Sequence, residues 1–97
     1  MLLKPGVDIS KLDRPVRRIL GNIDDLYGEY KHELVITSTY EGTHRPDSLH
    51  YANQAIDIRY PKGIIKTKVA TDIRNAIGKN FDIVLENTHI HIEYDPK

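Results

Sequence analysis

The sequence predicts a small α+β domain, in which an antiparallel sheet packs against two helices that lie on one face. Two segments carry apolar residues at every third or fourth position, which indicates amphipathic helices. Other segments are β-branched or alternate between apolar and polar residues, which indicates strands. The last two predicted strands are separated by two residues only, so we expect them to form an antiparallel hairpin.

The first half of the chain predicts one helix and then one strand. Asp13 can cap the helix, and Pro15 suits its first turn because the missing amide hydrogen is not needed there. The apolar stripe of this helix consists of Val16, Ile19, Leu20, Ile23, Tyr27 and Tyr30. Residues 34–40 are β-branched and aromatic and predict a strand, and residues 42–49 are rich in turn formers and predict a loop.

The second half of the chain predicts a strand, a helix and the hairpin. Residues 54–60 alternate, with Ile56, Ile58 and Tyr60 on one face and Ala55, Asp57 and Arg59 on the other. The helix that follows should bury Val69, Ile73, Ala76 and Ile77. Gly78 is placed to end it in a left-handed conformation. Residues 81–86 and 89–94 form the hairpin, and Thr88 is a poor turn residue, so we allow for a loop longer than two residues.

Length and composition bound the function. The chain has 97 residues, so we expect residues 1–97 to form a single domain, since typical domains have about 100–200 residues. The 14 basic and 14 acidic residues give a formal net charge of zero, which argues against nucleic-acid binding by a basic face. The sequence contains no cysteine, so disulfides and thiolate metal sites are excluded, and histidine and carboxylate remain as the strong metal ligands.

Histidine and carboxylate side chains gather in two clusters. His50 and Asp57 are seven residues apart, and residues 86–93 contain His89 and His91 with a glutamate at each end. Imidazole together with carboxylate is the ligand set that a divalent metal of the zinc type prefers. Three protein ligands from these clusters would leave one position open for water, and an open position distinguishes a catalytic zinc site from a structural one.

Strand periodicity decides which of these side chains can meet. Side chains alternate along a strand, so His89, His91 and Glu93 should share one face while the isoleucines between them take the core face. Asp57 also lies opposite the apolar face of its own strand. The sequence therefore permits His50, Asp57 and His91 to converge without loss of the hydrophobic core.

Residues 48–57, S-L-H-Y-A-N-Q-A-I-D, are similar to the signature S-x-H-x-x-G-x-A-x-D of the zinc-dependent D-alanyl-D-alanine carboxypeptidase family. That family includes dipeptidases and phage endolysin peptidases that cut peptidoglycan stem peptides. Residues 43–46, T-H-R-P, resemble the loop that precedes the signature, and residues 91–94, H-I-E-Y, resemble its closing H-x-E-Y motif. The resemblance covers residues 38–94 and implies the small α+β fold that this family shares with lysostaphin-type enzymes and the Hedgehog signalling domain.

The resemblance implies a zinc ion, Zn²⁺, held by His50, Asp57 and His91. Two positions depart from the family pattern. Asn53 stands where the family has glycine, although asparagine is the residue that best replaces glycine at positive φ. Thr88 stands three residues before the closing histidine, where the family has an acid.

The resemblance also implies the catalytic residues. Glu86 or His89 would act as the general base, and Arg45 would hold a substrate carboxylate or the developing oxyanion. The closing segment resembles the His-x-His branch of the wider group, in which the second histidine, here His91, binds the metal. In an alternative register His89 would be the ligand and Glu86 the base. We expect Glu93 to lie beside a ligand or at the surface rather than to bind the metal.

The function expected from these residues is that of a zinc-dependent peptidase, carboxypeptidase or endopeptidase, that hydrolyses an amide bond in peptidoglycan stem peptides. A phage lysin is one form that it could take. The alternative is a non-catalytic zinc-containing binding module, or a phage structural component, on the same fold. The threonine in place of the family's acid favours this alternative.

The beginning of the chain and its hydropathy shape the expected location. The N-terminal segment M-L-L-K-P-G has an apolar stretch of two residues, which is too short for a signal peptide. No segment approaches the roughly 20 apolar residues that span a bilayer. We therefore expect a monomer that is made in the cytoplasm, does not insert into membranes, and is delivered to the cell wall by another component.

Overall fold

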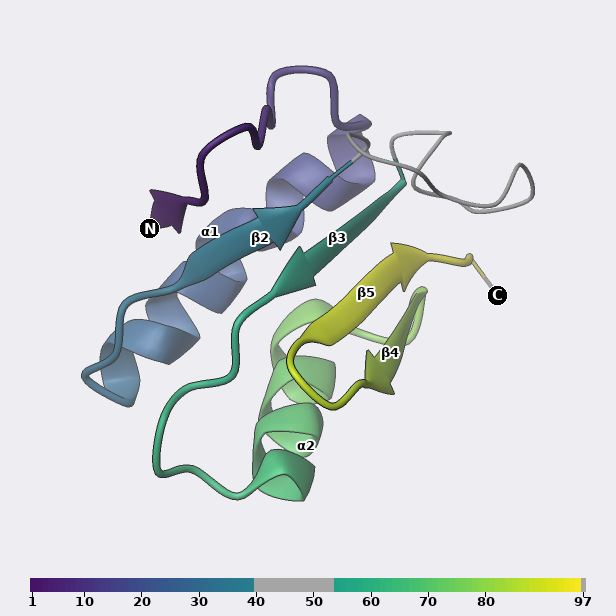
Figure 1. Cartoon of the computed structure of the whole chain (residues 1–97). Coiled ribbons are helices and arrows are strands. Elements are labelled where there is room, and N and C mark those ends of the chain that lie inside the picture. The colour runs from purple at the N-terminus through teal and green to yellow at the C-terminus, as the bar shows by residue number, and fades with distance from the viewer. Residues whose placement is uncertain (40–53, 97) are drawn as a thin grey trace.

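The computed structural model describes residues 1–39 and 54–96 and shows a five-stranded sheet with two helices. The strands follow the order β1-β2-β3-β5-β4 across the sheet, and Figure 1 shows both helices behind it. The helices are α1 (Arg14–Glu29) and α2 (Lys66–Ile77). The strands are β1 (Leu2–Leu3), β2 (Val35–Ser38), β3 (Ala55–Ile58), β4 (Phe81–Leu85) and β5 (Ile90–Tyr94). The predicted α+β class is confirmed.

The sheet is mixed, so the prediction of a wholly antiparallel sheet is wrong at one edge. β1 pairs with β2 in parallel, with Leu2 opposite Val35, whereas the other neighbours are antiparallel. A parallel pair needs a crossover connection, and α1 provides it. Two residues are too few to show the alternation that marks a strand in a sequence, which is why this edge was not predicted.

Helix α1 begins where the sequence predicts. Asp13 occupies the N-cap position, but its side chain makes no capping hydrogen bond. Pro15 explains part of this difference, because an N-cap carboxylate accepts from the second or third helical amide and proline has no N–H at the second. The buried face of the helix consists of Val16, Ile19, Leu20, Ile23, Leu26 and Tyr27.

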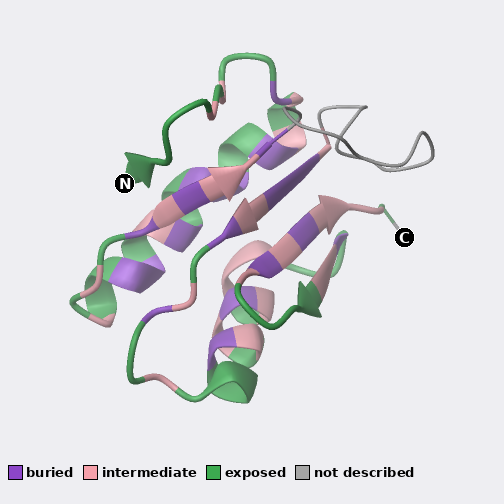
Figure 2. Cartoon of the chain, in the orientation of Figure 1, coloured by how far each residue is buried: buried purple, intermediate pink, exposed green. Residues whose placement is uncertain are grey.

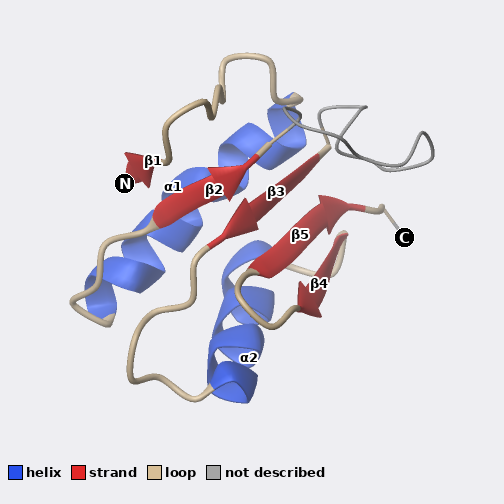
Figure 3. Cartoon of the chain, in the orientation of Figure 1, coloured by secondary structure: helices blue, strands red, loops and turns tan. Residues whose placement is uncertain are grey.

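The core lies between the helices and one face of the sheet. In Figure 2 buried and partly exposed residues alternate along the first part of β5, and the buried residues of β3 and β5 include Ile56, Ile58, Ile90 and Ile92. Helix α2 contributes Val69 and Ile73, whereas Ala76 and Ile77, also expected in the core, are only half-buried. Gly78 follows the helix at φ 85°, as predicted. Figure 3 shows the two helices side by side under the sheet. In residues 1–39 and 54–96 no helix is long and apolar enough to cross a membrane.

Replacing Ile92 with alanine should destabilise the protein by about 2–5 kcal/mol, because a buried cavity replaces three carbon atoms of the side chain. Ile92 is 0% exposed and lies between Ile56 and Ile83 on the neighbouring strands. Ile65→Ala is the matched control, since that side chain is 72% exposed, and it should change the free energy of unfolding by about 0.5 kcal/mol or less. Urea unfolding measures both. Equal effects of the two substitutions would contradict the placement of β5 in the core.

Tyr30 at the end of α1 is bound to α2 through Asp72. The Tyr30 hydroxyl donates to Oδ2 of Asp72 at 2.6 Å, and Nζ of Lys68 donates to the same oxygen at 2.6 Å. The Lys68 hydrogen bond, and after it the Tyr30 hydrogen bond, hold the pKa of Asp72 below its ordinary value of 3.8. The carboxylate therefore contributes stability above pH 3.8, and this contribution is lost as the pH falls through the lower pKa of the folded state.

Asp72→Asn should accordingly be less stable than the parent protein at pH 7, with a difference that shrinks below about pH 4 as the parent's Asp72 becomes protonated. Urea midpoints of the two proteins across that pH range measure the effect. Asp25→Asn is the control, because the Asp25 carboxylate has no hydrogen bond or ion pair in the part of the chain that the structure describes. A difference at Asp72 that stays constant across the pH range would contradict this assignment.

Candidate functional site

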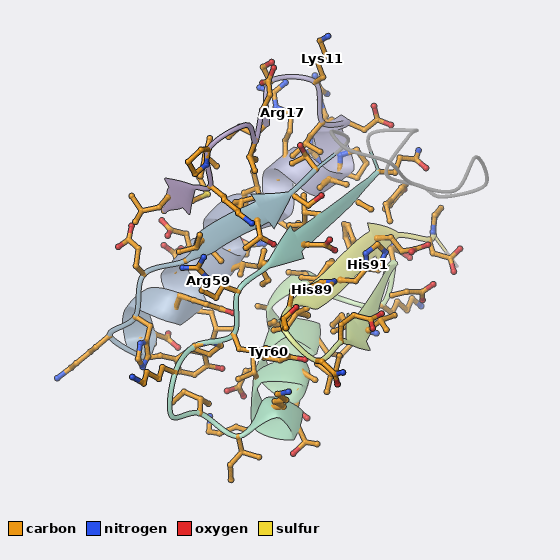
Figure 4. The ribbon with its side chains drawn as sticks, in the orientation of Figure 1. Lys11, Arg17, Arg59, Tyr60, His89 and His91 are labelled. Carbon is orange, nitrogen blue, oxygen red and sulfur yellow. The ribbon has the colours of Figure 1, made fainter. Side chains whose placement is uncertain are left out.

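The central strands β3 and β5 present polar side chains on the sheet face that the helices leave open. Asp57 lies directly opposite His91, and Ala55 lies opposite Glu93. The isoleucines between them point into the core and are 0% exposed. The predicted alternation of β5 is thus confirmed, because its core face is built of isoleucine and its open face holds His91 and Glu93. Figure 4 shows where His91 lies on this strand.

Asp57, His91 and Glu93 form a continuous chain of polar contacts, which we call the Asp57–His91–Glu93 cluster. Nδ1 of His91 lies 2.9 Å from Oδ1 of Asp57, and Nε2 of His91 lies 2.6 Å from Oε1 of Glu93. The side chains are 13%, 17% and 28% exposed for Asp57, His91 and Glu93, so the cluster is largely shielded from water but still reachable. One imidazole ring is therefore held between two carboxylates.

This arrangement favours a positive charge on the imidazole. The hydrogen bond to Asp57 raises the pKa of His91 above its ordinary value, burial opposes the rise, and the hydrogen bond to Glu93 adds to it. Both ring nitrogens can donate at once only in the imidazolium form. In the neutral form, one nitrogen lone pair faces a carboxylate oxygen, and a cation between them relieves that repulsion. Nδ1 of His91 and Oδ1 of Asp57 are thus suited to hold either a proton or a metal ion between them.

His89 lies at the edge of the same cluster. Its Nε2 is 3.7 Å from Oδ2 of Asp57, which is the oxygen that His91 does not use. Its Nδ1 is 3.2 Å from the hydroxyl of Thr88. The His89 side chain is 32% exposed, more than that of His91, so it is the histidine nearer to solvent.

The turn between β4 and β5 fixes the position of His89. The amide of Glu86 donates to the carbonyl of His89 at 2.9 Å, which leaves Asn87 and Thr88 at the tip. These two residues are the tip of a connection between Leu85 and Ile90 that is longer than two residues, as the sequence analysis allowed, and neither tip residue has a positive φ. Two side chains from outside the hairpin hold it, since the Tyr60 hydroxyl donates to the Glu86 carbonyl at 2.6 Å and Nζ of Lys66 donates to the Asn87 carbonyl at 3.2 Å.

The structure brings three of the predicted site residues together, namely Asp57, His89 and His91. The Glu86 carboxylate is exposed and has no hydrogen bond or ion pair to the cluster within residues 1–39 and 54–96. His50 and Arg45 lie outside the described residues. Oε1 of Glu93 lies 2.6 Å from Nε2 of His91, the histidine that the resemblance makes a ligand.

A metal ion could be held at the cluster by Asp57 and His91, whose donor atoms face each other. No group of three or more His, Asp or Glu side chains in residues 1–39 and 54–96 is arranged to hold a metal ion by itself. The contact between His91 and Glu93 fits a ligand histidine, because such a histidine donates its second ring N–H to a carboxylate that fixes its tautomer. The donor set therefore fits a zinc-type ion, with further ligands to come from outside the described part.

The sequence did not indicate that two basic residues, Lys4 and Arg59, lie near the cluster. Lys4 and Arg59 line a hollow together with His89. Arg59 could have been found, because alternation places it on the same face as Asp57 two residues earlier. Lys4 could not, since its position depends on the pairing of β1.

Comparison with known proteins adds nothing to this geometry, because no protein-family model matches the sequence and no curated protein matches it significantly.

Proposed function

We propose that this protein is a zinc-dependent peptidase that hydrolyses an amide bond in peptidoglycan stem peptides. The observation that carries the proposal is the pair of contacts on His91, with Asp57 on one ring nitrogen and Glu93 on the other. A ligand pair next to a carboxylate that orients the histidine is the arrangement expected at a metal site. The resemblance of residues 48–57 to the carboxypeptidase signature supports the same ligand, Asp57, and adds His50 as a third.

The metal-binding residues would be His50, Asp57 and His91. A zinc ion bound there supplies Lewis-acid polarisation of a carbonyl and lowers the pKa of water towards about 7. With Glu93 accepting the Nε2 proton of His91, Nδ1 would be the ring nitrogen that binds the metal. Asp57 contributes the negative charge that balances the cation.

His89 is the better placed of the two candidates for the general base. Its Nε2 lies 3.7 Å from Oδ2 of Asp57, at the side of the cluster that is nearer to solvent. The Thr88 hydroxyl can donate to Nδ1 and so hold the ring. Arg45 is assigned to the substrate carboxylate or the oxyanion on the resemblance alone.

The proposed function also implies a fold and a place of action. The mixed sheet with both helices on one face is compatible with the small α+β scaffold of the carboxypeptidase and Hedgehog group. Activity on stem peptides requires that the protein reach the cell wall.

A second candidate is a metal-binding module without turnover, including a phage structural component. It is favoured by two observations: Thr88 replaces the family's acid, and the Glu86 carboxylate makes no contact with the cluster in the described part of the chain. The scaffold alone does not distinguish the two, because function depends on the site and not on the fold.

The experiment that separates the candidates is digestion of purified peptidoglycan, and of a synthetic stem peptide, followed by mass spectrometry of the products. The peptidase proposal expects cleaved peptide with zinc present and none after treatment with a chelator, with recovery when zinc is restored. Zinc binding without any cleavage would favour the binding module. Cleavage that resists the chelator would refute a metal-dependent mechanism.

A further inference from the structure

A hollow of about 340 Å³ lies beside the Asp57–His91–Glu93 cluster and shares His89 with it. Four other residues line it, namely Lys4, Thr37, Arg59 and Thr88. They come from the segment after β1, from β2, from the end of β3 and from the hairpin turn. Figure 4 shows Arg59 and His89 at the same end of the two central strands. The volume is at the small end of the range for ligand pockets, about 300–1,000 Å³, which suits a single residue or small group.

The charge of this hollow is positive. Among residues 1–39 and 54–96 no carboxylate lines it, and the lining includes one lysine, one arginine and one histidine. Within residues 1–39 and 54–96, the Lys4 ammonium and the Arg59 guanidinium form no hydrogen bond and no ion pair. Two cations that share one concave surface repel each other, so an anion that enters between them is stabilised by both. Thr37 adds a neutral hydroxyl to the lining.

Hydrogen bonds fix the backbone at two of the residues that line the hollow, Lys4 and Arg59. The Lys4 amide donates to the Ile36 carbonyl at 2.9 Å, and the Arg59 amide donates to the Val35 carbonyl at 3.0 Å. The hydroxyl of buried Tyr27 donates to the Arg59 carbonyl at 2.7 Å, which ties that end of β3 to α1. A site whose lining is fixed in this way loses less entropy on binding.

We propose that the Lys4–Arg59 hollow binds a carboxylate of the substrate peptide and so sets which amide reaches the cluster. Arg59 suits this role because its planar guanidinium matches the two oxygens of a carboxylate, and Lys4 adds a second charge. His89 joins the two sites, with Nε2 towards Asp57 and the ring in the wall of the hollow. The role in substrate selection rests on the proposed peptidase function, whereas the binding of a carboxylate does not.

A binding titration tests the site without any need for turnover. Acetyl-D-alanine, added to isotope-labelled protein, should shift the NMR signals of Arg59, Thr88 and His89 and saturate, whereas the neutral acetyl-D-alaninamide should not. Lys4→Ala and Arg59→Ala should each weaken this binding about 10–100-fold, as expected for the loss of a hydrogen bond to a charged group. Arg17→Ala is the control, because that exposed arginine lies on α1 and does not line the hollow.

A second titration uses inorganic phosphate, because the two cationic side chains could also bind this anion. Phosphate that binds more tightly than the carboxylate would overturn the assignment, and so would a carboxylate titration that is unchanged in both variants. In a peptidase assay, Arg59→Ala should raise KM about 10–100-fold for a peptide with a free carboxylate and change kcat much less, with partial recovery in Arg59→Lys. Saturable carboxylate binding without cleavage would support the carboxylate site in the hollow and refute the peptidase function. Cleavage without carboxylate binding would support the peptidase function and refute the carboxylate site.

Discussion

Asp57→Ala and His91→Ala should each lower the affinity of the protein for zinc by more than about 100-fold. These two residues supply the donor atoms that face each other at 2.9 Å, so each substitution removes a ligand. Glu93→Gln should have a smaller effect, about 10–100-fold, because it changes only the carboxylate that orients His91. His50→Ala should lower zinc affinity as much as these two substitutions, because the resemblance implies that His50 is also a ligand. Competition with a chromophoric chelator measures all four.

The matched control for this series is His32→Ala. His32 lies after α1, away from the cluster, and should leave zinc affinity unchanged. The ligand variants should remain folded but be less stable by about 1–3 kcal/mol, because the remaining side chain of the pair loses one hydrogen bond to a charged group. Parental zinc affinity in both Asp57→Ala and His91→Ala would contradict the assignment of the metal site.

His89→Ala should keep its zinc and lose about 10²–10⁴ of the rate of peptide hydrolysis, which is the usual effect of removing a general base. The reason is geometric, since His89 approaches Asp57 through the oxygen that His91 leaves unused and is the more exposed of the two histidines. The measurement is kcat on a stem peptide with zinc content determined on the same sample. Glu86→Gln is the comparison, and it should have a smaller effect because its carboxylate makes no contact with the cluster in the described residues.

Two outcomes would change the assignment of the base. Loss of zinc in His89→Ala, together with retention in His91→Ala, would favour the alternative register with His89 as ligand and Glu86 as base. Full activity in both His89→Ala and Glu86→Gln would refute the proposed mechanism.

The local pattern of the sequence predicted much of the fold, because helix and strand periodicity reflect which residues are buried. The stripe from Val16 to Tyr27 and the alternation of Ile90 and Ile92 are both found in the core. The two-residue strand β1 was missed, since such a short segment has no period and is held by backbone pairing with β2. Ala76 and Ile77 are less buried than expected because they lie in the last turn of α2.

The sequence predicted which face of its strand each candidate site residue lies on, but not which residues contact each other. Alternation placed His89, His91 and Glu93 on one side of β5, and Asp57 on the corresponding side of β3. The register that sets Asp57 opposite His91 joins residues 34 positions apart, and local pattern does not determine such a pairing. For the same reason the sequence did not indicate that Lys4 from the N-terminal segment and Arg59 would line one hollow.

The most direct test of the central claim is the metal content of the protein purified without chelator, together with its melting temperature before and after zinc is added. We expect one zinc ion per chain by elemental analysis. We also expect chelation to lower the melting temperature and zinc to restore it, because a ligand at 1,000 times its Kd stabilises the folded state by about 4 kcal/mol. Protein that contains no transition metal, and whose melting temperature does not respond to zinc, would contradict the metal site and the peptidase proposed from it.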